Sequence, residues 1–223
     1  MAKEKQIKSK SRVKERGEVF TNEREVKAMV DLVKEPSSDP AATVLEPSCG
    51  NGNFLIEVLR RKIETIKKTT ISEDRDVYDS HLLQAVCSIY GVDIALDNVE
   101  EAREKLLREA VDTNPFGSDI VTDYNIEWVL KKNIICGDML TLLTEDSKPI
   151  VFNQYTFSST QNNDVLDLVV YQPFVFKTQV VGKKKKEQQT IIVNEPCGEV
   201  QYRFFLQLYQ EKTLEEFLKK DKE

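Results

Sequence analysis

Apolar residues along the chain alternate between short continuous runs and longer stretches at helical spacing. The short runs predict strands and cover residues 43–46, 91–94, 134–136, 166–170 and 191–193. The helical spacing predicts a helix after Asn22, a second over 55–66, a short one over 82–88, one that begins at Asp97, and one over 200–218. Strands that alternate with helices predict an α/β fold, with a mostly parallel central sheet and helices on both faces.

Three stretches lie outside this pattern. Residues 69–80 are polar and predict a loop, whereas residues 140–165, rich in Gln, Asn, Thr and Ser, carry no pattern that assigns an element. The first 16 residues hold seven Lys or Arg against two Glu. We therefore predict a flexible basic arm over residues 1–17, followed by a single domain over residues 18–223.

Composition narrows the class of protein. The 223 residues are 40% apolar, which allows a sizeable core, and no apolar run is long enough to span a membrane. The charged N-terminus lacks the apolar segment of a secretion signal. Four widely spaced cysteines and a single histidine argue against a zinc site and favour reduced thiols in the cytoplasm.

The total charge and its distribution along the chain point in different directions on nucleic-acid binding. The net charge of −6 is not that of a general nucleic-acid binder. The arm and a second basic run, Lys183–Lys186, could nevertheless contact phosphates. The alternative is that both are simply solvated, as charge runs commonly are.

A glycine motif follows the first predicted strand. Leu45–Phe54 reads LEPSCGNGNF, so that a strand ending in Glu46 leads through Gly50 and Gly52 into a helix. Glycines let a ligand approach the backbone, and the free N–H groups of a helix start suit a nucleotide-like cofactor. Leu55 occupies the third glycine position of a dinucleotide site, and no phosphate-binding P-loop pattern is present. The alternative is a tight turn without a ligand.

Acidic residues end the next two predicted strands. Asp93 closes YGVDI and Asp138 closes NIICGD. An aspartate after a strand is often only a turn residue, but ligands of open α/β sheets bind beyond the carboxyl ends of the strands. Glu46, Asp93 and Asp138 would gather there, and Asp93 could accept hydrogen bonds from two ribose hydroxyls. This set favours a bound cofactor over three unrelated turns.

These motifs resemble those of a known enzyme family. LEPSCGNGNFL, SIYGVDI, DNVEEAR and the segment Arg12–Val33, which contains GEVFTN, are similar to the adenine-N6 DNA methyltransferases of restriction–modification systems. The similarity covers roughly residues 12–138 in order and spacing. It implies the Rossmann-like fold of class I methyltransferases and S-adenosyl-L-methionine (SAM) as cofactor.

The resemblance also implies roles for individual residues. Those at the methionine end of SAM would be Phe20, Thr21, Glu46, Ser48 and the backbone of Gly50 and Gly52. Asp93 would hold the ribose hydroxyls, Ile94 would pack on the adenine, and Asp138 would accept from the adenine amino group. Asn22 stands where the family usually has proline.

The catalytic motif departs from the family pattern. The family places [DN]PP[YF] after the fourth strand, where its residues hold a flipped base. Here LDLVVYQPFVF (Leu166–Phe176) occupies that place. Gln172 replaces the Asn or Asp, a single Pro173 follows, and Phe174 comes one residue early. The alternative is an ordinary strand end.

Three functions are compatible with this sequence. The first is an adenine-N6 DNA methyltransferase, weakened or incomplete because of its catalytic segment. The second is a non-catalytic SAM-binding or interaction protein derived from such an enzyme, and the third a methyltransferase for another amino group in protein or RNA. A chain of 223 residues leaves little room for reading DNA sequence. We therefore expect DNA to be bound weakly or through a specificity or restriction subunit, and no membrane association.

Overall fold

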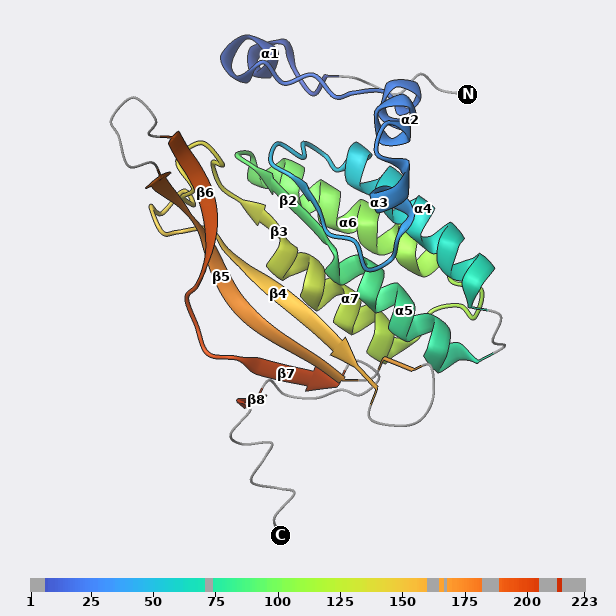
Figure 1. The fold of residues 1–223 in the computed structure, drawn as a ribbon. Coiled ribbons are helices and arrows are strands. Elements are labelled where there is room, and N and C mark those ends of the chain that lie inside the picture. Colours follow the sequence, from blue (N-terminus) through green and yellow to red (C-terminus); the bar gives the residue numbers. More distant parts are fainter. Residues whose placement is uncertain are drawn as a thin grey trace.

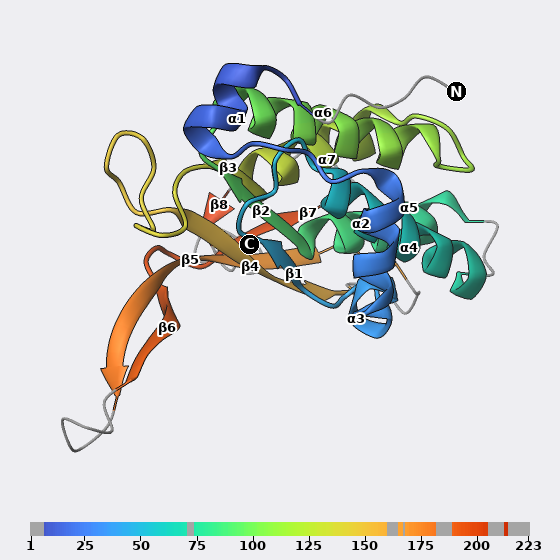
Figure 2. The same cartoon turned by 90° about the horizontal axis from the view of Figure 1, so that it is seen from above.

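The computed structural model describes residues 7–70, 74–159, 165–166, 168–181, 189–204 and 212–213. Within them the chain forms three layers, which are helices, a parallel sheet and an antiparallel sheet (Figures 1 and 2). No helix in the described part of the chain is long and apolar enough to cross a membrane.

The parallel sheet consists of three strands in the order β1-β2-β3. They are β1 (Val44–Glu46), β2 (Ile89–Asp93) and β3 (Ile134–Cys136). These strands confirm the first three that the apolar runs predict. Every residue of β2 is buried, as the middle strand of a sheet covered on both faces requires.

Seven helices are described, and the largest four lie on one face of the parallel sheet (Figure 1). Their bounds are α1 (Lys10–Arg16), α2 (Glu23–Asp31), α3 (Lys34–Ser38), α4 (Asn53–Thr69), α5 (Arg75–Cys87), α6 (Leu96–Asp112) and α7 (Ile120–Asn133). The predicted start at Asn22 is confirmed, since its side chain accepts from the backbone N–H groups of Arg24 and Glu25. The main core fills the space between these helices and the sheet.

Two helices differ from the sequence-based expectation. Helix α5 begins at Arg75, inside the predicted loop, because Asp74 caps it by accepting from the backbone N–H of Asp76. Helix α7 was not predicted at all. Its polar residues Thr122, Asn125 and Asn133 are buried, so its sequence does not show one apolar and one polar face.

The expectation of helices on both faces is wrong for the described residues. An antiparallel sheet covers the second face, with β4 (Val151–Ser158), β5 (Leu168–Val181), β6 (Gln189–Pro196), β7 (Gln201–Phe204) and β8 (Lys212–Thr213). Strand β5 pairs with β4 on one side and with β6 and β7 on the other.

Three sequence-based expectations therefore need correction. The predicted fourth and fifth strands lie in β5 and β6, which are antiparallel and not parallel. The stretch 140–165 contains β4. The helix expected over 200–218 is wrong for residues 201–204 and 212–213, which are strands, and its other residues from 205 on lie outside the described part.

A second apolar core joins the two sheets. Tyr90 and Val92 point away from the helices and pack with Ile150 and Phe152. The rings of Tyr90 and Phe152 meet edge to face, with centroids 5.7 Å apart. The Tyr90 hydroxyl also donates to the backbone carbonyl of Asn153 at 2.6 Å. Strand β4 is thereby held against the middle of the parallel sheet.

The basic arm contains a helix where we expected a flexible segment. Ser9 caps α1 by accepting from the backbone N–H of Arg12, and Gly17 ends it in the left-handed conformation with φ 65°. Ion pairs from Lys8 and Arg12 to Asp97 hold this segment against α6. The division into an arm over 1–17 and one domain over 18–223 stays a prediction.

A buried lysine ties α4 to the segment between α3 and β1. Lys62 is fully buried, and its ammonium donates to the backbone carbonyls of Asp39 at 2.5 Å and Ala42 at 2.6 Å. Burial lowers the pKa of Lys62 to about 8. Between pH 8 and the ordinary pKa of 10.5, the unfolded chain therefore binds more protons at this residue than the folded chain.

We expect Lys62→Met to change how stability depends on pH. Stability rises with pH wherever the unfolded state binds more protons, so Lys62 should favour the wild type increasingly above pH 8. The wild type should gain on the order of 1–3 kcal/mol relative to Lys62→Met between pH 7 and 10.5. Urea unfolding at several pH values measures this, with the exposed Lys67→Met as control. Parallel stability curves for wild type and Lys62→Met would contradict the prediction.

Candidate functional site

The glycine turn after β1 has a backbone that only glycine accommodates easily. Gly50 and Gly52 have φ angles of 52° and 86°, and Gly52 is the N-cap of α4. A β-carbon on Gly52 would lie 2.9 Å from the β-carbon of Ala102 on α6. The turn is tied to β2, since the backbone N–H of Cys49 donates to the carbonyl of Val92 at 2.8 Å. These contacts place the turn at the carboxyl ends of β1 and β2.

A small pocket of about 130 Å³ opens beside this turn. Five of the predicted cofactor residues line it, namely Phe20, Thr21, Glu46, Ser48 and Gly50. They come from the segment before α2, the end of β1 and the turn. The structure therefore brings together residues that the sequence separates by up to 30 positions.

The residues that line this pocket are suited to binding a ligand and do not supply a nucleophile. Burial raises the pKa of the Glu46 carboxyl, and the Ser48 backbone N–H donates weakly to it at 3.4 Å. Burial also raises the pKa of the Cys49 thiol to about 12, so it stays protonated and is no nucleophile at neutral pH. A β-carbon on Gly50 would make only an ordinary contact with the Phe20 ring, at 3.4 Å, so the backbone φ of 52° is what favours glycine at this position.

Asp93 ends β2 directly beside the turn. Its Oδ2 accepts from the Gly50 backbone N–H at 3.0 Å. Its Oδ1 accepts from the Ala95 backbone N–H at 2.9 Å and from the Asn98 amide at 3.1 Å. Asp93 is thus a buried carboxylate that links the glycine turn, β2 and α6.

The two remaining predicted cofactor residues lie next to Asp93. The side chain of Ile94 is 56% exposed, so its apolar surface is accessible for the packing on adenine that the resemblance implies. The backbone N–H of Gly137 donates to the Asp93 carbonyl, which places Asp138 at the end of β3 beside β2. The Oδ1 of Asp138 accepts from the Leu140 backbone N–H at 2.8 Å, so it also serves as a turn residue.

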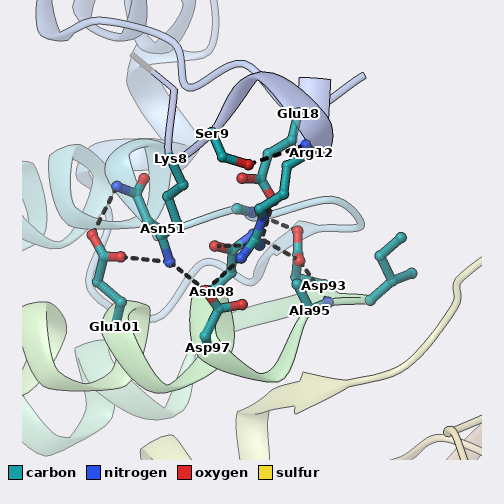
Figure 3. Close-up of polar contacts among 12 residues, drawn as sticks. Lys8, Ser9, Arg12, Glu18, Asn51, Asp93, Ala95, Asp97, Asn98 and Glu101 are labelled. Atoms are coloured by element: carbon teal, nitrogen blue, oxygen red, sulfur yellow. Dashed lines mark hydrogen bonds and ion pairs between the residues drawn. The ribbon is translucent and has the colours of Figure 1, made fainter. Parts of the chain in front are cut away.

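Sequence reasoning missed a polar network above Asp93 (Figure 3). Arg12 donates to Glu18 at 3.0 Å from Nε and 2.5 Å from Nη2, and to Asp97 at 2.6 Å. The Asn98 amide donates to Glu18 at 3.1 Å as well as to Asp93. Two of these contacts, from Arg12 to Asp97 and from Asn98 to Glu18, join residues 85 and 80 positions apart in the chain, and no local pattern in the sequence marks them.

Lys8 extends the same network along α6. It lies 2.9 Å from both Asp97 and Glu101. Hydrogen bonds from Arg12 and Lys8 hold the pKa of Asp97 well below its usual value. Burial alone would raise the pKa of Glu101, but hydrogen bonds from Lys105, Lys8 and Asn51 lower it to about 2. Lys8 and Arg12 are therefore already paired with carboxylates, and the second basic run lies outside the described residues.

Comparison with known proteins now identifies the family. The model of the N-6 DNA methylase family matches residues 6–195 of the chain. The chain belongs to this family. The match includes the arm helix, the glycine turn and Asp93, and also the predicted catalytic segment in β5.

One relative among curated proteins gives the same indication. A putative type II restriction enzyme and methyltransferase of Methanocaldococcus jannaschii is 28% identical over 149 residues. The aligned region is 65% of this chain but only 12% of that protein. The chain therefore corresponds to a small part of the relative's length. No solved structure matches the chain.

In this N-6 DNA methylase chain, the predicted catalytic segment is not at a strand end. Gln172, Pro173 and Phe174 lie in the middle of β5, paired in register with Gln154, Asn153 and Phe152 of β4. The β-branched and aromatic residues on both sides of them, Val169–Tyr171 and Phe174–Phe176, extend the strand. The expected strand end after residue 170 is therefore wrong.

The structure does not bring this segment into the pocket beside the glycine turn. Phe174 packs with Phe152 and Phe176, with ring centroids 5.8 and 5.5 Å away. It also lines a cavity with Leu45 and Tyr90, on the face of the parallel sheet opposite the helices. Its ring is thus partly buried against the second core and lies away from the pocket beside the glycine turn.

Proposed function

We propose that this chain is the cofactor-binding part of a SAM-dependent DNA methyltransferase that acts on the N6 amino group of adenine in a restriction–modification system. One observation carries the proposal. Five of the predicted cofactor residues, from the segment before α2 and from the end of β1 with its glycine turn, line a single pocket at the carboxyl ends of parallel strands, beside the buried Asp93. The described parallel sheet has three strands, in the order β1-β2-β3. The topology of class I methyltransferases is therefore part of the proposal.

The residues of the pocket fit the methionine end of SAM. A volume of about 130 Å³ equals that of roughly four liquid waters, which is room for an amino-acid group but not for the whole cofactor. Glu46 would face the ammonium of the cofactor, and Phe20 and Thr21 would close the opposite wall. The adenosine would extend over Asp93 and the exposed Ile94, with Asp138 accepting from its amino group.

When bound, SAM would supply a methyl group already activated by the sulfonium. The residues of the chain therefore need only to orient and enclose, and no acid–base residue is required in the pocket. The protonated Cys49 and the half-buried Glu46 agree with such a role. We propose DNA as the substrate, bound weakly or through a specificity or restriction subunit, and a cytoplasmic location.

A specific observation favours a second candidate, a SAM-binding protein that does not catalyse transfer. Gln172 pairs with Gln154 of β4, and Phe174 is held within β5 by pairing on both sides, with Phe152 and with Pro196. A residue that must contact a flipped base needs access to it. The two candidates share the cofactor site and differ in whether transfer follows.

Calorimetry with SAM and with S-adenosylhomocysteine tests the shared part. We expect binding in the micromolar range, and Asp93→Ala should weaken it by about 1–3 kcal/mol, the range for hydrogen bonds to a charged group. The control is Asp112→Ala, which removes an exposed aspartate at the end of α6. Urea unfolding of each variant separates lost binding from lost folding. A folded wild type that binds neither compound would refute the proposed function.

A further inference from the structure

Asp93 is nearly saturated by the protein itself. A carboxylate offers about four acceptor positions, and three are taken by the N–H groups of Gly50, Ala95 and Asn98. A ribose presents two hydroxyls on adjacent carbons. Asp93 can therefore accept one of them, and the second needs another acceptor nearby.

Glu18 is a carboxylate that the network holds close to Asp93, through the amide of Asn98 (Figure 3). The Asn98 amide nitrogen lies 3.1 Å from the Oε2 of Glu18 and 3.1 Å from the Oδ1 of Asp93, which limits the separation of these oxygens to twice that distance. A hydroxyl reaches an acceptor about 2.7 Å away. Two adjacent hydroxyls can thus bridge two carboxylates placed in this way.

One oxygen of Glu18 lacks a donor. Its Oε2 accepts from Arg12 and Asn98, whereas its Oε1 is buried and has no hydrogen-bond partner among the described residues. The side chain is only 11% exposed. A buried carboxylate oxygen without a donor costs free energy, which a hydroxyl from a ligand would recover.

Arg12 offsets part of the negative charge that gathers here. It forms a two-nitrogen contact with Glu18 and also pairs with Asp97. Glu18 lies immediately before Val19, Phe20 and Thr21, which line the pocket. The segment that directly follows the arm therefore contributes a wall to the same site as the glycine turn.

We propose that Glu18 is a ribose-binding residue, which shares the two ribose hydroxyls of the cofactor with Asp93. Arg12 and Asn98 are its positioning residues. This assignment rests on the proposed function, because it concerns the same cofactor. It gives the basic arm a task in cofactor binding in place of the DNA contact that its charge suggests.

Ligands that lack one hydroxyl test the assignment. Calorimetry would compare S-adenosylhomocysteine with its 2′-deoxy and 3′-deoxy analogues, on wild type and on Glu18→Gln. Glu18→Gln should weaken binding of S-adenosylhomocysteine roughly tenfold or more, as expected for a hydrogen bond to a charged group. That loss should largely disappear for the analogue without the hydroxyl that Glu18 holds. The matched control, Glu15→Gln, neutralises an exposed glutamate on α1 and should bind like wild type.

A second variant guards against a simple folding defect. Glu18→Asp keeps the charge beside Arg12 but withdraws the oxygens by one methylene, and it should show the same selectivity between the analogues. Equal losses for all three ligands in both variants would mean that Glu18 acts only through the structure, and would overturn the assignment. Unchanged binding in both variants would overturn it too. If folded wild type binds none of the ligands, the proposed function itself fails.

Discussion

Replacing Gly52 by alanine is expected to lower the free energy of unfolding by about 2–5 kcal/mol. Two costs add at this position. A residue with a β-carbon is strained at a φ of 86°, and the new methyl group would lie 2.9 Å from the β-carbon and 3.1 Å from the α-carbon of Ala102. The second contact is with backbone and cannot be relieved by a rotamer change. Urea unfolding measures the loss, and calorimetry should show weaker cofactor binding.

A matched glycine separates the two costs. Gly117 has a φ of 76°, and nothing lies within 4 Å of the position where its β-carbon would be. Gly117→Ala should therefore show only the backbone strain, about 1–2 kcal/mol. Adding Ala102→Gly to Gly52→Ala should restore part of the lost stability. Equal losses for Gly52→Ala and Gly117→Ala would show that the approach of α6 to the turn is unimportant.

Methyl transfer to DNA by this chain alone is expected to be at least about a hundredfold slower than by an established adenine-N6 methyltransferase. Gln172 carries its carbonyl one methylene further out than asparagine, and a displacement near 1 Å can cost about that factor. The structure adds a second obstacle, since the Phe174 ring packs against Phe152 and Phe176. A transfer assay with tritiated SAM on mixed-sequence duplex and single-stranded DNA measures the rate.

The residue opposite Gln172 provides the control for this assay. Gln154 faces it in register on β4, so Gln154→Ala perturbs the same part of the sheet without changing the predicted catalytic segment. A rapid wild-type rate that Gln172→Ala abolishes and Gln154→Ala preserves would contradict the expectation. It would establish Gln172 as a working catalytic residue and exclude the non-catalytic candidate.

The elements around the cofactor site were predictable because local signals mark them. Asn22 caps its helix through its own side chain, and Gly50 and Gly52 mark a turn between a buried run and an amphipathic helix. Asp93 and Asp138 mark strand ends. Each of these signals acts within a few residues, which is the range over which a single sequence is informative.

The second half of the fold depends on pairing that local signals do not encode. The run around Val169 and Val170 reads as a buried strand, but a short apolar run has no preference for a parallel or an antiparallel neighbour. Helix α7 escaped notice because its buried face includes asparagines, and Asn133 donates to the carbonyls of Cys87 and Ile89. The contacts of Glu18 and Asn98 join residues 80 positions apart, beyond any sequence pattern.

The two sheets differ in how much chain must be closed to form them. Parallel pairing joins Val44 to Ile89, whereas the antiparallel sheet pairs Val181 with Gln189. Loop-closure entropy grows with the length of chain between paired residues, and topologies with distant contacts form slowly. The antiparallel sheet is therefore favoured to form first during folding. Its apolar face would then be available for β2 to pack against. In this order β5, whose first residues resemble a fourth parallel strand, pairs with β4 and β7 before the parallel sheet has formed.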